Sequence, residues 1–209
     1  MKQRVCCFVD GFNLYHAIDA LHEPQLKWVD LWGLSEAFIT PASERLVAVH
    51  YFTALAYWLD EPRRRHRAFI AANQHLGVSV TLGHFKEKPR TCRRCGARHI
   101  QREEKESDVN LAIQLLHGAA SDGFDRALVI SADSDLCPPI RLIQQSYPHK
   151  RVTVLAPPNR YAQCRDFRSI TDTRKIRRKH LQNNLLPAIA HNREGRELFR
   201  RPQAYAPPQ

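Results

Sequence analysis

Short apolar runs without polar alternation constrain the fold of this chain most. Residues 4–9, 126–131 and 151–156 are apolar at nearly every position, with no regular polar face. A strand of this kind is typical of a parallel sheet that is buried on both faces. Residues 45–52 and 78–82, rich in Val and aromatic side chains or flanked by turn residues, are predicted as two further strands.

Segments with helical spacing separate these strands. Helices are predicted at residues 13–21, 30–38, 60–76, 107–120 and 139–146, with Asp or Ser as N-cap of three of them and Gly77 after the third. Strands that alternate with helices favour right-handed βαβ units. The expected fold is therefore α/β, a three-layer α/β/α sandwich with a mainly parallel sheet of about five strands.

Two segments break this rhythm. Residues 84–104 are polar and basic and contain two Cys, so they are interpreted as an insertion within a domain that spans residues 1–173. From residue 174 onward the periodicity weakens and Pro becomes frequent. Residues 174–209 are therefore predicted to be a basic, partly disordered C-terminal extension.

Positive charge is concentrated in a few segments. Lys and Arg number 32 against 21 Asp and Glu, which gives a net charge of +11. The excess lies in residues 86–105, in residues 174–209 and in an Arg cluster at 63–67, whereas the rest of the chain is net acidic. Such basic segments favour a polyanion such as RNA as partner. Deletion of residues 174–209 is expected to weaken RNA binding but to leave the chemistry of the remaining chain at saturating RNA largely intact.

The same composition argues against several classes of protein. No apolar run approaches the roughly 20 residues that span a bilayer, and the N-terminal apolar stretch is too short for a signal peptide. Six Cys without a secretory signal favour reduced thiols or metal ligands, which suits a cytoplasmic protein. The sequence leaves the oligomeric state open, a homodimer included.

Acidic residues follow two of the buried strands and begin one helix. Asp10 ends the first strand, Asp133 and Asp135 follow the fourth, and Asp108 lies in the first turn of a helix. Each Asp alone is more often a cap or a turn residue. Ligands of parallel sheets bind beyond the carboxyl ends of the strands, where these carboxylates would converge and repel one another. A set of this kind suits Mg²⁺ or Mn²⁺, which can activate a water against a phosphodiester.

Polar neighbours add to this set. Asn13 could orient a water or a phosphate beside Asp10, and Ser131 and Ser134 place hydroxyls beside Asp133. None of the eleven His stands in a pattern with a nucleophile, so a Ser/His hydrolase is not supported.

Three stretches in order, FVDGFNL at 8–14, EKESDV at 104–109 and VISADSD at 129–135, resemble the NYN domain family of the PIN-like group of metal-dependent ribonucleases. The resemblance covers about residues 4–170 and implies an RNA endonuclease with an acidic metal-binding pocket. It implies Asp10, Asp108 and Asp133 as the main metal-linked acids, Asp135 as a fourth, and Asn13 as an accessory. It also implies a phosphate contact for Lys105. Ala132 stands where the family usually has Gly.

The Cys pair allows two interpretations. Cys92 and Cys95 form a CxxC followed by Gly96, and His84 and His99 lie close in sequence, so these four side chains could form a structural Zn²⁺ site. The other interpretation is an exposed basic loop with two free thiols. In either case the insertion is a candidate substrate clamp, through Arg93, Arg94 and Arg98, and three loop aromatics are candidates for base stacking, Tyr57, Trp58 and Tyr161.

Two other functions stay open. One is a non-catalytic RNA-binding regulatory module with the same fold. The other is a phosphohydrolase of small esters that uses Asp10 as nucleophile, although Phe12 stands where such enzymes need a second acid.

Overall fold

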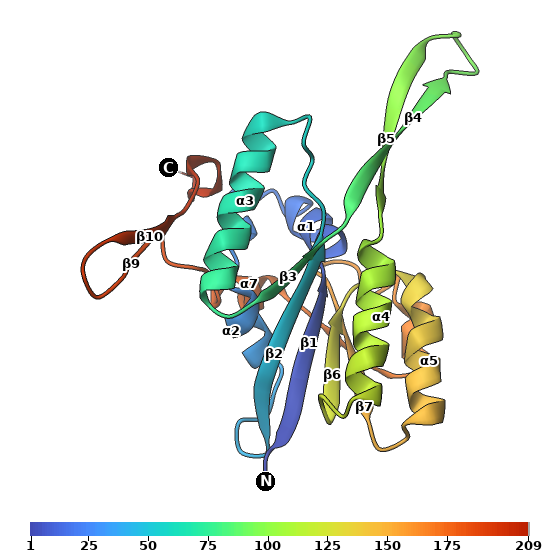
Figure 1. The fold of residues 1–209 in the computed structure, drawn as a ribbon, viewed down its shortest axis with the longest axis vertical. Helices are drawn as coiled ribbons and strands as arrows, with labels where there is room; N and C mark the ends of the chain where they lie inside the picture. Colours follow the sequence, from blue (N-terminus) through green and yellow to red (C-terminus); the bar gives the residue numbers. More distant parts are fainter. Residues whose placement is uncertain (209) are drawn as a thin grey trace.

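A six-stranded parallel sheet forms the centre of the molecule (Figure 1), in the order β3-β2-β1-β6-β7-β8. The computed structural model describes residues 1–208. The six strands are β1 (Gln3–Asp10), β2 (Glu44–Thr53), β3 (Ser79–Leu82), β6 (Arg126–Ile130), β7 (Arg151–Ala156) and β8 (Asp172–Lys175). The remaining strands form two separate antiparallel hairpins, β4 (His84–Thr91) with β5 (Arg98–Lys105) and β9 (Ile189–His191) with β10 (Glu197–Arg200).

Helices cover both faces of this sheet. The longer ones are α1 (Gly11–Asp19), α2 (Leu31–Glu36), α3 (Asp60–His75), α4 (Ser107–Ala120) and α5 (Cys137–Ser146). The shorter ones are α6 (Arg165–Arg168), α7 (Arg178–Gln182), η1 (Pro24–Lys27), η2 (Ser134–Leu136) and η3 (Gln203–Tyr205). This arrangement confirms the predicted three-layer sandwich, with β8 as one strand more than expected. Within residues 1–208, no helix is both long and apolar enough to cross a membrane.

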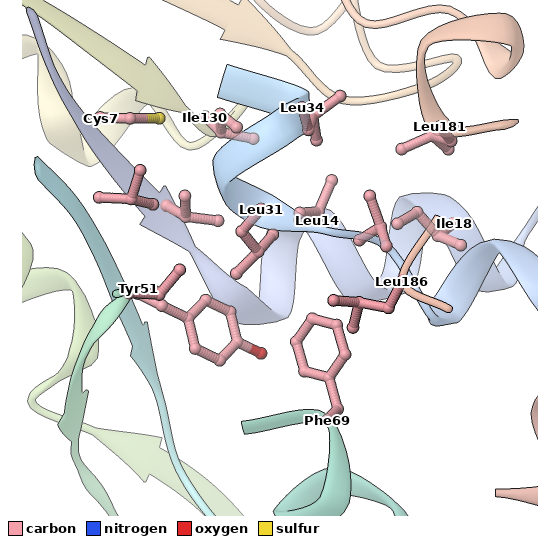
Figure 2. Close-up of a cluster of buried hydrophobic side chains, with 14 of the residues drawn as sticks. Cys7, Leu14, Ile18, Leu31, Leu34, Tyr51, Phe69, Ile130, Leu181 and Leu186 are labelled. Atoms are coloured by element: carbon pink, nitrogen blue, oxygen red, sulfur yellow. The ribbon is translucent and has the colours of Figure 1, made fainter. Parts of the chain in front are cut away.

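Strand β1 divides the apolar interior into two clusters. Val5, Cys7 and Val9 belong to the cluster under α1, α2 and α3, part of which is drawn in Figure 2, whereas Cys6 and Phe8 belong to the cluster under α4 and α5. Successive side chains of a strand point to opposite faces, which explains why the run is apolar throughout. Burial raises the pKa of the Cys6 thiol to about 11, so this thiol stays protonated and acts as a small apolar core side chain.

The insertion is a long hairpin that projects from the body on the side where the parallel strands end (Figure 1). Strands β4 and β5 pair from His84 opposite Lys105 at the base to Thr91 opposite Arg98 near the tip. Most of its side chains are exposed, so they carry no alternation between a buried and a solvent face. This absence of a buried face explains why the sequence did not indicate strands here.

The segment after residue 174 packs against the body in the residues that the structure describes, whereas the sequence predicted a partly disordered extension; Gln209 lies outside the described residues. Leu186 N–H donates to the carbonyl of Trp28 (2.9 Å), and the indole N–H of Trp28 donates to the carbonyl of Pro187 (2.9 Å). Five apolar side chains of this segment join the cluster under α1 to α3, namely Ile176, Leu181, Leu186, Phe199 and Tyr205. Figure 2 shows Leu181 and Leu186 within that cluster.

A buried ion pair stabilises the end of the sheet where the strands begin. Arg126 Nη1 contacts Glu44 Oε1 at 2.9 Å, and both side chains are only 5 % exposed. Replacing Arg126 with Met is expected to lower the free energy of unfolding by about 3 kcal/mol, because it leaves the Glu44 carboxylate buried with only the Thr40 N–H and Arg151 as partners. Urea unfolding measures this change. A loss below about 1 kcal/mol would show that the pair is already screened by water.

Candidate functional site

Asp10 is held where strand β1 meets helix α1. Its Oδ1 accepts a hydrogen bond from Asn13 N–H (3.0 Å), which caps the helix, and its Oδ2 accepts one from the Ser131 hydroxyl (2.8 Å). Gly11 is required at this junction, because a Cβ there would lie 2.6 Å from the carbonyl oxygen of Phe52. These contacts fix the orientation of a carboxylate that is only 5 % exposed.

The loop after strand β6 is tied to the same point. Asn13 Oδ1 accepts a hydrogen bond from Ala132 N–H (3.0 Å), and Ser131 Oγ accepts one from Asp133 N–H (3.0 Å). Ala132 does not have a positive φ, so the residue that replaces the usual Gly is unstrained. Asn13 and Ser131 therefore hold the loop backbone and orient Asp10.

Asp108 approaches from the other face of the sheet, in the first turn of α4. The predicted cap of this helix differs from the structure. Ser107 is the first helical residue, and the Glu104 carboxylate accepts from both its N–H (3.1 Å) and its hydroxyl (2.6 Å). Glu106 precedes the helix with a φ of 81°, a strained conformation for a residue with a side chain.

These elements enclose one acidic cleft of about 680 Å³, which contains four carboxylates. The cleft is lined by Asp10, Phe12, Asn13, His16, Phe85, Arg102, Glu104, Asp108, Asp133, Arg160 and Gln163. Four of the predicted residues, Asp10, Asn13, Asp108 and Asp133, thus come together from three separate segments. A larger hollow of about 1180 Å³ lies at the opposite end of the sheet and contains none of the motif residues.

Crowding of the carboxylates in the acidic cleft raises the pKa of two of them, Asp108 and Asp10. Burial and the charges of Asp10, Asp133, Glu104 and Asp135 raise the pKa of Asp108 to about 6. Burial also raises the pKa of Asp10, although the hydrogen bonds from Asn13 and Ser131 oppose that shift. The cleft thus concentrates negative charge at a cost to stability that a bound cation would offset.

Several predicted site residues lie outside the acidic cleft. Ser134 and Asp135 are exposed on η2 beside Asp133. Lys105 pairs with Glu103 (3.1 Å) at the base of the hairpin. Arg93, Arg94 and Arg98 are exposed near its tip.

The four-ligand Zn²⁺ site is not formed. His84 lies at the base of the hairpin, eight residues of extended chain from Cys92 at its tip, a span of roughly 26 Å at about 3.3 Å per residue. Among residues 1–208 no group of three His, Cys, Asp or Glu side chains is spaced to hold a metal. The hairpin pairing places the proposed ligands too far apart, and the two Cys thiols are free.

The loop aromatics have partners within the chain. Phe85 stacks edge to face on Trp58 (4.7 Å between ring centroids), and the guanidinium of Arg102 lies 4.5 Å from the Trp58 ring centre. Trp58 thus anchors the hairpin to the body. Tyr161 contacts Arg168 and Lys175 through its ring, at 4.9 and 4.3 Å.

Sequence reasoning missed most of the other residues that line the cleft. Glu104 lies within a recognised stretch, but it stands three positions before Ser107, whereas the acid of a capping box stands three positions after the Ser, so no capping pattern marks it. Arg160 and Gln163 lie in the loop after β7, and no motif marks them. Arg160 contacts Gln163 (3.3 Å) and, within the described residues, forms no ion pair.

Replacing Asp108 with Asn is expected to raise the melting temperature of the metal-free protein by about 2–4 °C at pH 7.5. The pKa of Asp108 is raised in the folded state to about 6, so the wild type loses stability as pH rises from the unfolded value of about 4 through 6. The side chain is partly exposed, which limits the gain to about 1 kcal/mol. Thermal unfolding in EDTA at pH 5 and 7.5 measures it. An equal gain at both pH values would contradict the electrostatic origin.

One curated protein and one solved structure are similar to this chain. The chain is 27 % identical over 190 residues to 6-hydroxy-3-succinoylpyridine 3-monooxygenase HspA of Pseudomonas putida, which covers 74 % of this chain. The chain spans 59 % of the length of that relative. A crystal structure of VPA0982, a protein of unknown function from Vibrio parahaemolyticus, has the same fold with a TM-score of 0.53 and 22 % sequence identity. The superposition covers 88 % of this chain and 97 % of that one.

The family model of the NYN domain matches residues 4–174, which include all three recognised stretches and all but the first residue of β1 and the last residue of β8 in the central sheet. The match extends beyond half of the chain, and the parallel sandwich agrees with the PIN-like nuclease superfamily to which NYN domains point. The chain therefore belongs to the NYN domain family.

Proposed function

We propose that this protein is a metal-dependent ribonuclease that hydrolyses internal phosphodiester bonds of RNA. The observation that carries the proposal is the convergence of Asp10, Glu104, Asp108 and Asp133 in one cleft, where burial and mutual repulsion raise the pKa of Asp10 and Asp108. Membership of the NYN family supports a nuclease-type hydrolase. A binding module without a metal would gain nothing from carboxylates that repel one another.

The donor set suits a hard divalent cation. Asp10, Asp108 and Asp133 would hold Mg²⁺ or Mn²⁺, and Asp135 would assist directly or through a water. The described side chains do not yet form a closed metal site, so Asp108 and Asp133 would have to turn toward the ion, while Asp10 is fixed by its hydrogen bonds. When bound, such an ion activates a water and offsets charge on the phosphate.

The chain's own residues would orient the RNA. Arg160 faces the acidic cleft without an acidic partner in the described structure, so its guanidinium can bind a phosphate oxygen next to the scissile bond. Arg102 also lines the cleft, but it is shared with Glu87 (3.0 Å) and Trp58. Arg160 is therefore the stronger candidate for positioning the substrate.

The hairpin would extend this contact along the RNA. Arg93, Arg94 and Arg98 are exposed on it and Lys105 lies at its base, so they can bind phosphates away from the cleft. Such contacts raise affinity without reading sequence and weaken steeply with salt.

Cleavage of a fluorescent single-stranded RNA tests the proposal. The wild type should cut it with Mg²⁺ or Mn²⁺ and stop in EDTA, and Asp133→Asn should cut at least a hundredfold more slowly. Asp166→Asn is the matched control, because Asp166 is an exposed acid in the first turn of α6 and lies outside the cleft. Metal-independent RNA binding without cleavage would instead identify a non-catalytic RNA-binding module.

Two alternative activities on small molecules can be assayed with the same purified protein. The Pseudomonas relative is a monooxygenase of a pyridine compound, and an enclosed, largely aromatic hollow beside the acidic cleft would favour a related ring substrate here. Oxygen uptake with 6-hydroxypyridine-3-carboxylate and NADH as two-electron donor would replace the proposal if RNA stayed intact, and so would hydrolysis of a chromogenic phosphate ester.

A further inference from the structure

A second hollow of about 260 Å³ lies beside the acidic cleft and shares Phe12 and His16 with it. It is formed by α1, the loop after β2, and α3, and Tyr205 of η3 contributes to its wall. Most of its wall is apolar or aromatic, from Phe12, Tyr15, Tyr51, Ala54, Leu59 and Phe69. We call it the aromatic pocket. Figure 2 shows Tyr51 and Phe69 beside each other in the core cluster.

One cluster of polar atoms interrupts the apolar wall. The Tyr51 hydroxyl lies 3.2 Å from His66 Nε2, and the Thr53 hydroxyl lies 3.3 Å from the same atom. Tyr51 is 4 % exposed and Thr53 is 1 % exposed. Burial lowers the pKa of His66 to about 4, so its ring is neutral at pH 7. Two hydroxyls and a neutral imidazole can both donate to and accept from the edge of a planar ring.

The charge of the aromatic pocket is opposite to that of the acidic cleft. None of its lining residues is acidic, and Lys27, Arg63 and Arg65 contribute to its wall. Lys27 pairs with Asp19 and Arg63 with Asp60, whereas Arg65 has no acidic partner among the residues that the structure describes. An anion attached to a ring in this pocket would therefore meet an available guanidinium.

We propose that the aromatic pocket binds one base of the RNA, from a nucleotide close to the scissile phosphate, and that Arg65 contacts a phosphate of that nucleotide. The inference rests on the proposed ribonuclease function, because it places the base beside the acidic cleft through their common wall, Phe12 and His16. The volume lies just below the roughly 300–1,000 Å³ of pockets for drug-sized ligands, so it suits one planar ring system rather than a whole nucleotide.

Binding of abasic RNAs tests this assignment. Fluorescein-labelled hexaadenylate and six versions that each lack one base are titrated with the full chain in EDTA, with anisotropy as readout. Loss of one particular base should weaken binding about tenfold, since a stacked base contributes roughly 1–3 kcal/mol. Loss of bases outside the pocket and the acidic cleft should have smaller effects.

A variant that fills the aromatic pocket provides a second test, together with a matched control. Ala56 lines the aromatic pocket, so Ala56→Trp should weaken binding of the intact hexamer about tenfold and abolish its dependence on that one base. Ala71→Trp is the control, because Ala71 is exposed on α3 and lies outside the pocket. Tyr51→Phe, which removes only the hydroxyl, should change the preference between A and U at that position.

The outcomes separate this inference from the proposed function. RNA that is cleaved by the wild type but shows no single critical base overturns the pocket assignment and leaves the ribonuclease standing. One critical base without any cleavage supports the pocket and overturns the ribonuclease. Binding of free AMP or pyridine-3-carboxylate that Ala56→Trp abolishes, with no critical base in the RNA, overturns the assignment in favour of a free small molecule.

Discussion

Asp10→Asn is expected to lower the rate of RNA cleavage at saturating RNA and metal by about a thousandfold while preserving the fold. Asp10 is the most buried carboxylate of the acidic cleft, and its two oxygens are already oriented by Asn13 and Ser131. Removing its charge weakens the attraction for the cation that offsets charge in the transition state. Several kcal/mol of such stabilisation corresponds to about three orders of magnitude in rate.

The substitution keeps the local hydrogen bonds. The Asn carbonyl oxygen can still accept from Asn13 N–H, and the Ser131 hydroxyl can rotate to accept from the new amide. The melting temperature should therefore fall by no more than about 2 °C. Single-turnover cleavage and thermal unfolding are the measurements, with Asp166→Asn as control. A folded Asp10→Asn protein that cuts within tenfold of the wild type would remove Asp10 from the catalytic machinery.

A chain that stops at residue 173 is expected not to fold. It would lack half of strand β8 and the five apolar side chains that the segment buries, Ile176, Leu181, Leu186, Phe199 and Tyr205. At about 2 kcal/mol for each buried side chain, the loss is about 10 kcal/mol, which is comparable with the total stability of an ordinary domain.

Backbone contacts add to this loss. Residues 184–187 run beside 28–30, where Asp30 N–H donates to the carbonyl of Asn184 (2.8 Å) and Val29 forms a bridge with Leu185. Without them, the Trp28 indole N–H would lose its acceptor, the Pro187 carbonyl, and the ring would lose part of its apolar cover. The earlier expectation that residues 174–209 contribute only RNA affinity is therefore replaced by a structural role.

Circular dichroism and size-exclusion chromatography of the shortened chain measure this effect. A chain that stops at Ala206 is the control, because it keeps Phe199 and Tyr205 and should fold with a near-native melting temperature. A cooperative unfolding transition of the 1–173 chain within 5 °C of the full chain would contradict the structural role.

The central strands could be predicted because their signal is local. In β1, β6 and β7 almost every side chain is buried on one face or the other, so the sequence is apolar throughout and the strand ends stand out. Strand β8 at the edge of the sheet reads Asp-Thr-Arg-Lys and is mostly exposed. It has no apolar signal, and the sixth strand was missed for that reason.

The acidic residues could be predicted because topology alone brings the ends of parallel strands to one edge. Asp10 and Asp133 follow neighbouring strands, β1 and β6, so their proximity follows from strand order. Arg160 reaches the same cleft from the loop after β7, and only the path of that loop places it there. The expected Zn²⁺ site does not form for a related reason, because residues that are close in sequence lie far apart along an extended hairpin.

The sequence by itself therefore determined the parallel α/β sandwich and the set of Asp residues at its edge, because both depend on local burial patterns and strand ends. Only the tertiary structure decided that the basic C-terminal segment completes the core. It also decided that Glu104 and Arg160 join the acidic cleft and that Tyr205 contributes to a pocket beside it. These features depend on contacts between segments far apart in the chain, for which no local periodicity exists.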